Sequence, residues 1–187
     1  MEEEVNYGPL KGLIGTWEGG KGLDIAPEVD GSVEENPYFE TIIFDEAGSL
    51  SNAGKQELSM VRYHQVVKRK STGGVFHDEV GYWIWDANAK TVMRSFTIPR
   101  AVAIVAGGVF NGDAEKSEVT IEVAASVESL DWGIAQSPFM RDNAKTTAFE
   151  SKLVIQENKV SFFQKTSLEI YGKSFDHTDE NTLVRVT

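Results

Sequence analysis

The sequence contains no cysteine, and this absence excludes several classes of protein. Disulfide bonds, thiolate metal sites and thiol nucleophiles all need cysteine, so neither a thiol enzyme nor an iron–sulfur protein fits the chain. Long apolar runs are missing too, since no stretch reaches the length of about 18 residues that a membrane helix needs. The acidic start, Met1–Glu4, lacks the basic and apolar segments of a secretory signal. We therefore expect a soluble, cytoplasmic protein.

Positive charge is also scarce. The chain has 18 lysines and arginines against 29 aspartates and glutamates, which gives a formal net charge of -11. Nucleic-acid backbones and anionic lipid surfaces would be repelled by this mean field, so we expect neither nucleic acid nor a membrane as a partner. The acidic residues are spread along the chain, which favours a solvated surface. The oligomeric state stays open, with a homodimer as one option.

The length and composition suit one compact domain over residues 1–187, because 187 residues with a 41% hydrophobic share can build one core. Near the start, Pro9 stands at a first helical position, and Leu10 and Leu13 follow with helical spacing. This pattern predicts a short N-terminal helical turn that plugs or caps one end of the fold.

Beyond this turn the apolar residues recur at every second position, as in Val119, Ile121 and Val123. Turn signals such as 86–89, 111–113 and 157–159 separate these runs, and no long amphipathic helix lies between them. We expect strands at 16–25, 38–46, 57–69, 75–85, 90–98, 101–110, 117–127, 146–156, 159–171 and 182–186. Residues 26–37 and 128–145 show no clear alternation and are expected to be loops at a rim or lid.

About ten short strands joined in series predict an all-β fold with the topology of an antiparallel meander. Closing the sheet removes its exposed edges, and a closed barrel of this size can enclose a small ligand. The expected fold is thus an antiparallel up-and-down β-barrel, similar in architecture to lipocalins and fatty-acid-binding proteins.

Enzyme motifs are few. The sequence has no G-x-S-x-G elbow, no phosphate-binding glycine loop and no histidine pair at the helical spacing of a metal site. These absences leave enzymatic activity uncertain and favour a binding protein, in which a small apolar molecule occupies the barrel.

Three histidines are the natural candidates for a metal ligand: His64, His77 and His177. The alternation around His77 predicts a hydrogen-bonding role within one face of a strand. His177 is expected at the start of the last strand, where a side chain at the rim can lean over the barrel mouth. Asp176, Asp179 or a backbone carbonyl could accept a hydrogen bond from its second ring nitrogen.

The motifs resemble those of a known family. Leu13–Gly19 contains a G-x-W-x-G opening, His77–Tyr82 reads H-x-E-x-G-Y, and a C-terminal histidine precedes the last predicted strand. Together with the paired strands from Val92 to Gly108, these features span most of the chain. They are similar to those of the nitrobindin-like heme-binding β-barrels.

The resemblance implies a ferric heme b as cofactor, with His177 as its axial ligand and an apolar opposite side that leaves a coordination position for nitric oxide or another small ligand. It also implies that Gly15, Trp17 and Gly19 form the opening motif of the cofactor site. The family is associated with heme or nitric-oxide handling and with heme-dependent peroxynitrite isomerase activity. One departure is Thr178, which follows His177 where the family has leucine.

Two alternatives remain beside heme binding. The same barrel lining could hold a fatty acid or another apolar metabolite without iron. A third reading is catalysis on a bound small molecule, which would require converging polar side chains and a strongly shifted pKa inside the cavity.

Overall fold

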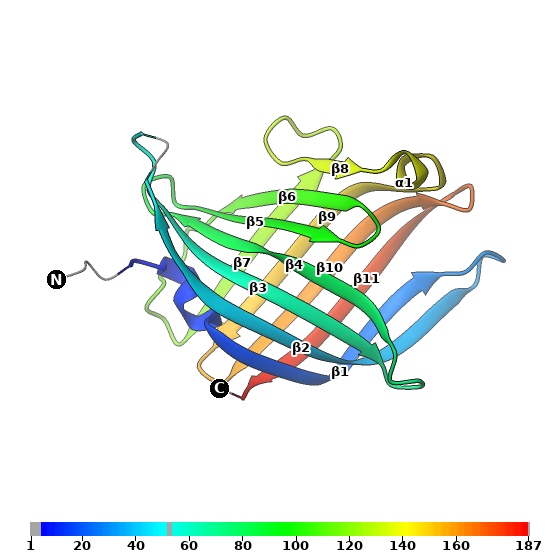
Figure 1. Cartoon of the computed structure of the whole chain (residues 1–187), viewed down its shortest axis with the longest axis horizontal. Helices are drawn as coiled ribbons and strands as arrows, with labels where there is room; N and C mark the ends of the chain where they lie inside the picture. Colours follow the sequence, from blue (N-terminus) through cyan, green and yellow to red (C-terminus); the bar gives the residue numbers. More distant parts are fainter. Residues whose placement is uncertain (1–4, 52–53, 187) are drawn as a thin grey trace.

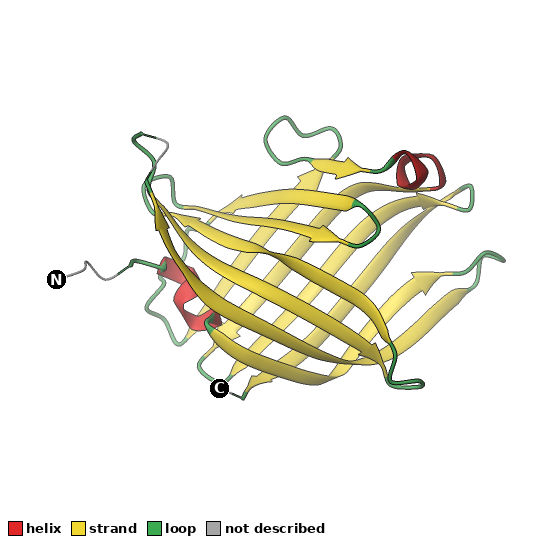
Figure 2. Cartoon of the chain, viewed as in Figure 1, coloured by secondary structure: helices red, strands yellow, loops and turns green. Residues whose placement is uncertain are grey.

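The computed structural model describes residues 5–51 and 54–186, and within them the chain forms one antiparallel sheet with two short helices (Figures 1 and 2). Met1–Glu4, on which the expectation about a secretory signal rests, lies outside the described residues. In the part described, no helix has the length and apolar character needed to cross a membrane.

The elements have the following bounds. The 3-10 turn is η1 (Gly8–Leu13) and the helix is α1 (Pro138–Asn143). The strands are β1 (Gly15–Pro27), β2 (Val33–Leu50), β3 (Leu58–Arg69), β4 (Val75–Asp86), β5 (Thr91–Ile98), β6 (Val102–Val109), β7 (Glu118–Ser126), β8 (Ile134–Gln136), β9 (Ala144–Gln156), β10 (Lys159–Ile170) and β11 (Lys173–Arg185).

The sheet closes on itself. Its order is β5-β4-β3-β2-β1-β11-β10-β9-β7-β6-β8, and β5 also pairs with β6 from Thr91↔Val109 to Ile98↔Val102. The short β8 pairs with β6 outside the ring, so ten of the described strands form the closed ring. The predicted antiparallel barrel of about ten strands is confirmed.

Alternation explains which side chains fill the interior. On β7, Val119, Ile121 and Val123 are buried while the residues between them are exposed. On β2 the buried positions run through every second residue from Asn36 to Phe44, and Glu40 is one of them. The register of the ladder therefore carries polar as well as apolar side chains inward.

One end of the barrel is closed by η1, as the sequence predicts. Leu10 and Leu13 are fully buried against the barrel core, and Pro9 begins the turn. Trp17 is also fully buried there, and its indole Nε1 donates to the Leu13 carbonyl at 2.7 Å. The opposite end, at the right of Figure 1, carries the β1–β2 turn, the β10–β11 turn and α1, and we call it the mouth.

Two loop predictions are wrong. Most of 26–37 is strand, because β1 runs to Pro27 and β2 starts at Val33, and 128–145 contains β8 and α1. The last strand is also longer than predicted: β11 starts at Lys173 and pairs with β10 without a break. In 26–37 and on β11, polar residues at inward positions hide the alternation, whereas backbone pairing with neighbouring strands holds the chain extended. In 128–145, the strand β8 has only three residues and α1 is a helix, so neither gives an alternating pattern.

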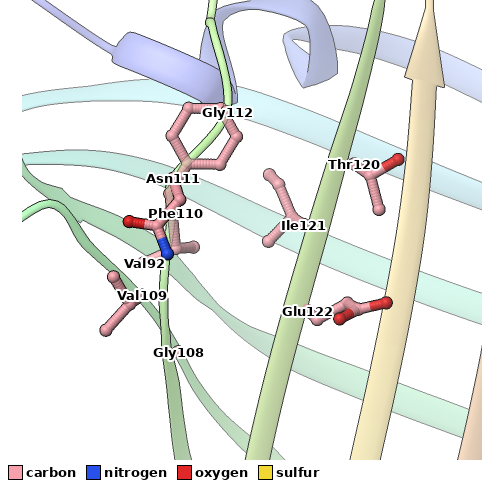
Figure 3. A pocket seen from close by; sticks show the side chains of 9 residues that line it. All are labelled: Val92, Gly108, Val109, Phe110, Asn111, Gly112, Thr120, Ile121 and Glu122. Atoms are coloured by element: carbon pink, nitrogen blue, oxygen red, sulfur yellow. The ribbon is translucent and has the colours of Figure 1, made fainter.

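The weakest closure lies between β6 and β7, which share a single residue pair, Gly107↔Ala124. Beside it, the two strands diverge around a hollow of about 140 Å³ lined in part by Phe110, Ile121 and Thr120 (Figure 3). Gly108 allows the close approach, since a Cβ at this residue would lie 2.1 Å from the Glu122 carbonyl oxygen.

We expect Gly108→Ala to destabilise the barrel by about 1–3 kcal/mol, because the new methyl group would push the β6 backbone away from β7. Urea denaturation measures this change in the free energy of unfolding. Gly133→Ala is the matched control, since nothing lies within 4 Å of a Cβ at that residue. Equal stabilities of the two variants would contradict the tight contact at Gly108.

Candidate functional site

His177 faces the interior of the barrel at the mouth. It shares its face of β11 with Asp179, Asn181 and Leu183, and the last two are buried. The His177 side chain is 32% exposed, which places it between the interior and solvent. His177 lies inside β11 and not at its start, so the predicted position is corrected by a few residues while the expected closeness to the mouth holds.

Asp24 holds the His177 ring. Its Oδ1 lies 2.5 Å from Nε2 of His177, although the two residues are 153 positions apart in the chain. The β1–β11 ladder explains this meeting, because Asp24 pairs with Asp179 and therefore lies diagonally across from His177. Neither carboxylate predicted from the sequence, Asp176 or Asp179, is the partner.

Asp24 is itself fixed by neighbouring strands. Its Oδ2 accepts a hydrogen bond from Asn36 Nδ2 at 3.0 Å, and Asn36 lies directly opposite on β2. The Oδ1 of Asn36 in turn accepts from an Arg69 guanidinium nitrogen on β3. The Arg69 guanidinium stacks over the Phe76 ring, 4.6 Å from its centroid. A chain of polar contacts thus runs from β3 to the imidazole.

Next to this chain, Tyr38 donates to Asp179 Oδ1 at 2.5 Å. Burial raises the pKa of Asp179 to about 6, although the hydrogen bond from Tyr38 lowers it. Burial also raises the pKa of Tyr38 far above its ordinary value, and the nearby carboxylates add to the effect. The wall of the mouth that carries His177 is therefore polar and acidic.

The wall across the barrel is apolar. In the ring of strands β5 and β6 lie opposite β11 and β1. Their inward residues towards the mouth are Phe96, Ile98, Val102 and Ile104, all of them in or against the hydrophobic core. The strands opposite β11 in the ring thus present aliphatic and aromatic side chains to the interior.

Below the mouth, a band of charged and polar side chains crosses the interior. Arg94 Nη2 donates to Glu79 Oε1 at 2.6 Å, and both side chains are almost fully buried. Arg94 also reaches from β5 to Gln164 on β10, with 2.9 Å between Nη1 and Oε1, and its Nε bonds the Tyr63 hydroxyl at 2.9 Å. Tyr63 donates its own hydrogen to Glu79. Burial alone would raise the pKa of Glu79, but Arg94 and His77 bring it below its ordinary value.

The free space beside this band is small. A cavity of about 20 Å³ lies between Arg94, Tyr63 and Phe162, among other residues. This volume can hold about one water molecule. Binding pockets for drug-sized ligands measure roughly 300–1,000 Å³. A large ligand therefore does not fit beside Arg94 unless the band itself opens.

His77 shares the inward face of β4 with Glu79, and the structure shows an ion pair between them in place of the predicted hydrogen bond. Nε2 of His77 lies 3.4 Å from Glu79 Oε2, an ion-pair distance without hydrogen-bond geometry. Burial lowers the pKa of His77, but Glu79 outweighs this effect and the pKa is raised overall. His64 lies outside the barrel, where it pairs with Asp78 at 3.1 Å.

The structure does not bring the opening motif to His177. Trp17 pairs with Arg185, eight residues after His177 on β11, which corresponds to roughly 26 Å along a strand. Gly15 lies beside it with φ +132. Gly19 makes room for Asn181, whose amide nitrogen would lie 2.6 Å from a Cβ there. These residues shape the capped half, and their part in cofactor binding stays a prediction.

Comparisons with known proteins agree with this fold. A family model described as the THAP4-like, heme-binding beta-barrel domain matches residues 6–185. Among solved structures, the crystal structure of Rv2717c from M. tuberculosis superposes with a TM-score of 0.73 at 18% sequence identity, covering 95% of each chain. No curated protein matches the sequence significantly.

The chain belongs to the THAP4-like heme-binding β-barrel family. The match spans nearly the whole chain, which confirms the resemblance to nitrobindin-like barrels inferred from the sequence motifs.

The mouth of this family member fits a heme in two respects. It offers an inward-facing imidazole, the common protein ligand of heme iron, and apolar side chains on the strands that lie across the ring. The imidazole also has a carboxylate partner, as ligating histidines commonly do. The contact is made by Nε2, however, so this nitrogen is already engaged.

We expect Arg94→Met to lower the free energy of unfolding by about 3–5 kcal/mol, because it leaves the Glu79 carboxylate buried without its cation. Urea denaturation at neutral pH measures the loss. The control is Arg62→Met, which breaks an exposed ion pair with Asp45 at 3.1 Å and should cost less than about 1 kcal/mol. A small, equal loss in both variants would show that the buried pair does not support the barrel.

Glu40 is a second buried carboxyl of the band. Its Oε2 accepts from Asn181 Nδ2 at 2.7 Å, and its Oε1 accepts from Gln65. Burial raises the pKa of Glu40 to about 8, despite these hydrogen bonds, which lower it. The folded protein therefore holds a proton on Glu40 that the unfolded chain, with an ordinary pKa of 4.5, has released at neutral pH.

Because the folded state binds this extra proton, raising the pH favours unfolding. We expect stability to fall as the pH rises from about 5 to 8, and to fall less in Glu40→Gln, which keeps the side-chain shape without titrating. Asp179 adds a similar fall below about pH 6, but it titrates in both proteins, so the difference between their profiles comes from Glu40. Thermal unfolding across this range tests the expectation, with Glu35→Gln, exposed on the same strand, as the control. Parallel profiles of Glu40→Gln and wild type would refute it.

Proposed function

We propose that this protein binds heme b at the mouth of the barrel, with His177 as the axial ligand of the iron. The observation that carries the proposal is the position of His177, which faces the interior opposite an apolar wall. The family match supports the same ligand class.

Different residues of the chain would ligate the iron, exclude water and support the ligand. His177 would hold the iron, and Phe96, Ile98, Val102 and Ile104 would exclude water from the opposite face of the macrocycle. The Arg94–Glu79 band would form the floor on which the ligand rests. Heme, when bound, supplies a coordination position for a small ligand such as nitric oxide.

We extend the proposal to heme or nitric-oxide handling in the cytoplasm, with peroxynitrite isomerisation as the associated chemistry. Such chemistry would belong to the iron, because the polar side chains of the band are engaged with one another. Converging polar groups and shifted pKa values do occur in the interior, but the space of about 20 Å³ beside Arg94 leaves no room there for a substrate. They are better explained as the structural centre of the barrel.

The hypothesis that the barrel carries a fatty acid or another apolar metabolite without iron is weaker, because the space beside Arg94 is small. A fatty acid would need a long interior cavity and a free cation for its carboxylate. Arg94, the cation at the centre, is already paired with Glu79, and the adjacent space is small. A heme ligated by His177 at the mouth would need neither this space nor Arg94.

Addition of hemin to the purified apoprotein tests the proposal. We expect a Soret band characteristic of histidine-ligated heme, and we expect His177→Ala to weaken binding at least tenfold, a loss of about 1.4 kcal/mol. His64→Ala is the matched control on the outer surface, and His77→Ala tests the other inward histidine. Both should bind hemin like wild type. An unchanged hemin affinity in His177→Ala, or a loss of affinity in His77→Ala alone, would overturn the ligand assignment.

A further inference from the structure

The contact between Asp24 and His177 involves the nitrogen that matters for iron. A carboxylate only accepts hydrogen bonds, so at 2.5 Å from Asp24 Oδ1 the Nε2 of His177 carries the hydrogen. A ring nitrogen that carries hydrogen has no lone pair for a metal, since ligation uses the unprotonated nitrogen of a neutral imidazole. In this arrangement Nε2, at the outer end of the imidazole ring, cannot ligate iron.

The second nitrogen is a poor substitute. Nδ1 lies beside the Cβ atom, so the histidine's own backbone and strand stand close to it and hinder a flat macrocycle. Nε2 is at the far end of the ring and is the nitrogen that a large planar ligand can reach. The structure thus places Asp24 where the iron would go.

The neighbours of Asp24 hold it in this place. The Asp24 side chain is only 9% exposed, and Asn36 bonds its other oxygen at 3.0 Å. Arg69, stacked on Phe76, bonds Asn36 from the far side. The carboxylate is therefore oriented by β2 and β3 before any ligand arrives, and the strands need not move to keep the contact.

From this geometry, and resting on the proposed function, we infer that Asp24 is the residue that determines whether His177 can bind iron: it holds Nε2 in the free protein, and heme must break this contact to bind. Hydrogen bonds to charged groups contribute enough to stability that their loss lowers an equilibrium constant roughly tenfold or more. Removing Asp24 should therefore tighten hemin binding by about that factor.

If Asp24 instead strengthened the binding of iron by His177, its removal would have the opposite effect on hemin affinity. If the ring turned on heme binding and donated from Nδ1 to Asp24, the carboxylate would orient the ligand and strengthen it. Loss of Asp24 would then weaken hemin binding. The sign of the change separates the two roles.

The experiment compares hemin affinity in wild type, Asp24→Ala and Asp24→Asn, each with and without His177→Ala. Asp24→Asn keeps the side-chain shape and removes the charge, so it provides an answer if Asp24→Ala does not fold. Asp176→Ala is the matched control: Asp176 is the neighbour of His177 in sequence and bonds Ser167 on the outer face, so this variant removes one acidic charge near the mouth without touching Nε2. We expect about tenfold tighter binding in Asp24→Ala, a smaller gain in Asp24→Asn, and no change in Asp176→Ala.

A measurement without heme completes the test. In ¹⁵N-histidine NMR spectra of the apoprotein, His177 should show a hydrogen on Nε2 that exchanges slowly with water in wild type and rapidly in Asp24→Ala. Absence of this signal in wild type overturns the inference whatever the hemin result. Hemin binding through His177 that is equal or weaker in Asp24→Ala also overturns it and leaves the proposed function intact. Failure of His177-dependent binding in every variant instead overturns the proposed function, and the inference with it.

Discussion

The ion pair between Arg94 and Glu79 is the constraint around which the interior is arranged. Two charges in a buried setting are tolerated only when their remaining hydrogen-bonding groups find partners. Tyr63 and Gln164 fill this need, and they come from β3 and β10, on different sides of the ring. Glu79 and Arg94 stand on the neighbouring strands β4 and β5, and the hydrogen bond from Arg94 to Gln164 ties them to β10, which touches neither strand in the sheet. The network stands where a lipocalin-like cavity would be.

This constraint divides the barrel into two halves with different roles. Between the band and η1, the interior is filled by apolar side chains such as Leu13, Trp17 and Leu183, which stabilise the fold. On the other side, the mouth holds polar groups, among them the half-buried His177 and the buried Asp24. The band, with a space of only about 20 Å³ beside it, prevents a ligand of appreciable size from lying deeper than the mouth.

The sequence predicted the barrel well because strand alternation and turn residues are local signals. Val119, Ile121 and Val123 show their burial directly, and Pro9 marks the turn that caps the barrel. The signal failed where inward residues are polar, as on β11, and the strand around His177 was therefore predicted too short.

The sequence predicted only part of the site, because the partners of its residues lie far away in the chain. His177 could be selected by residue type, but its partner Asp24 is 153 residues away, and only closure of β1 against β11 brings them together. Similarly, nothing local indicates that Arg94 on β5 and Glu79 on the neighbouring β4 form a buried ion pair.

The most direct test of this account is a crystal structure of the protein with hemin. The account predicts the macrocycle at the mouth, iron on Nε2 of His177, Asp24 released from this nitrogen, and an unbroken contact between Arg94 and Glu79. Hemin lying within the barrel with Arg94 and Glu79 separated, or iron bound to His77, would contradict it.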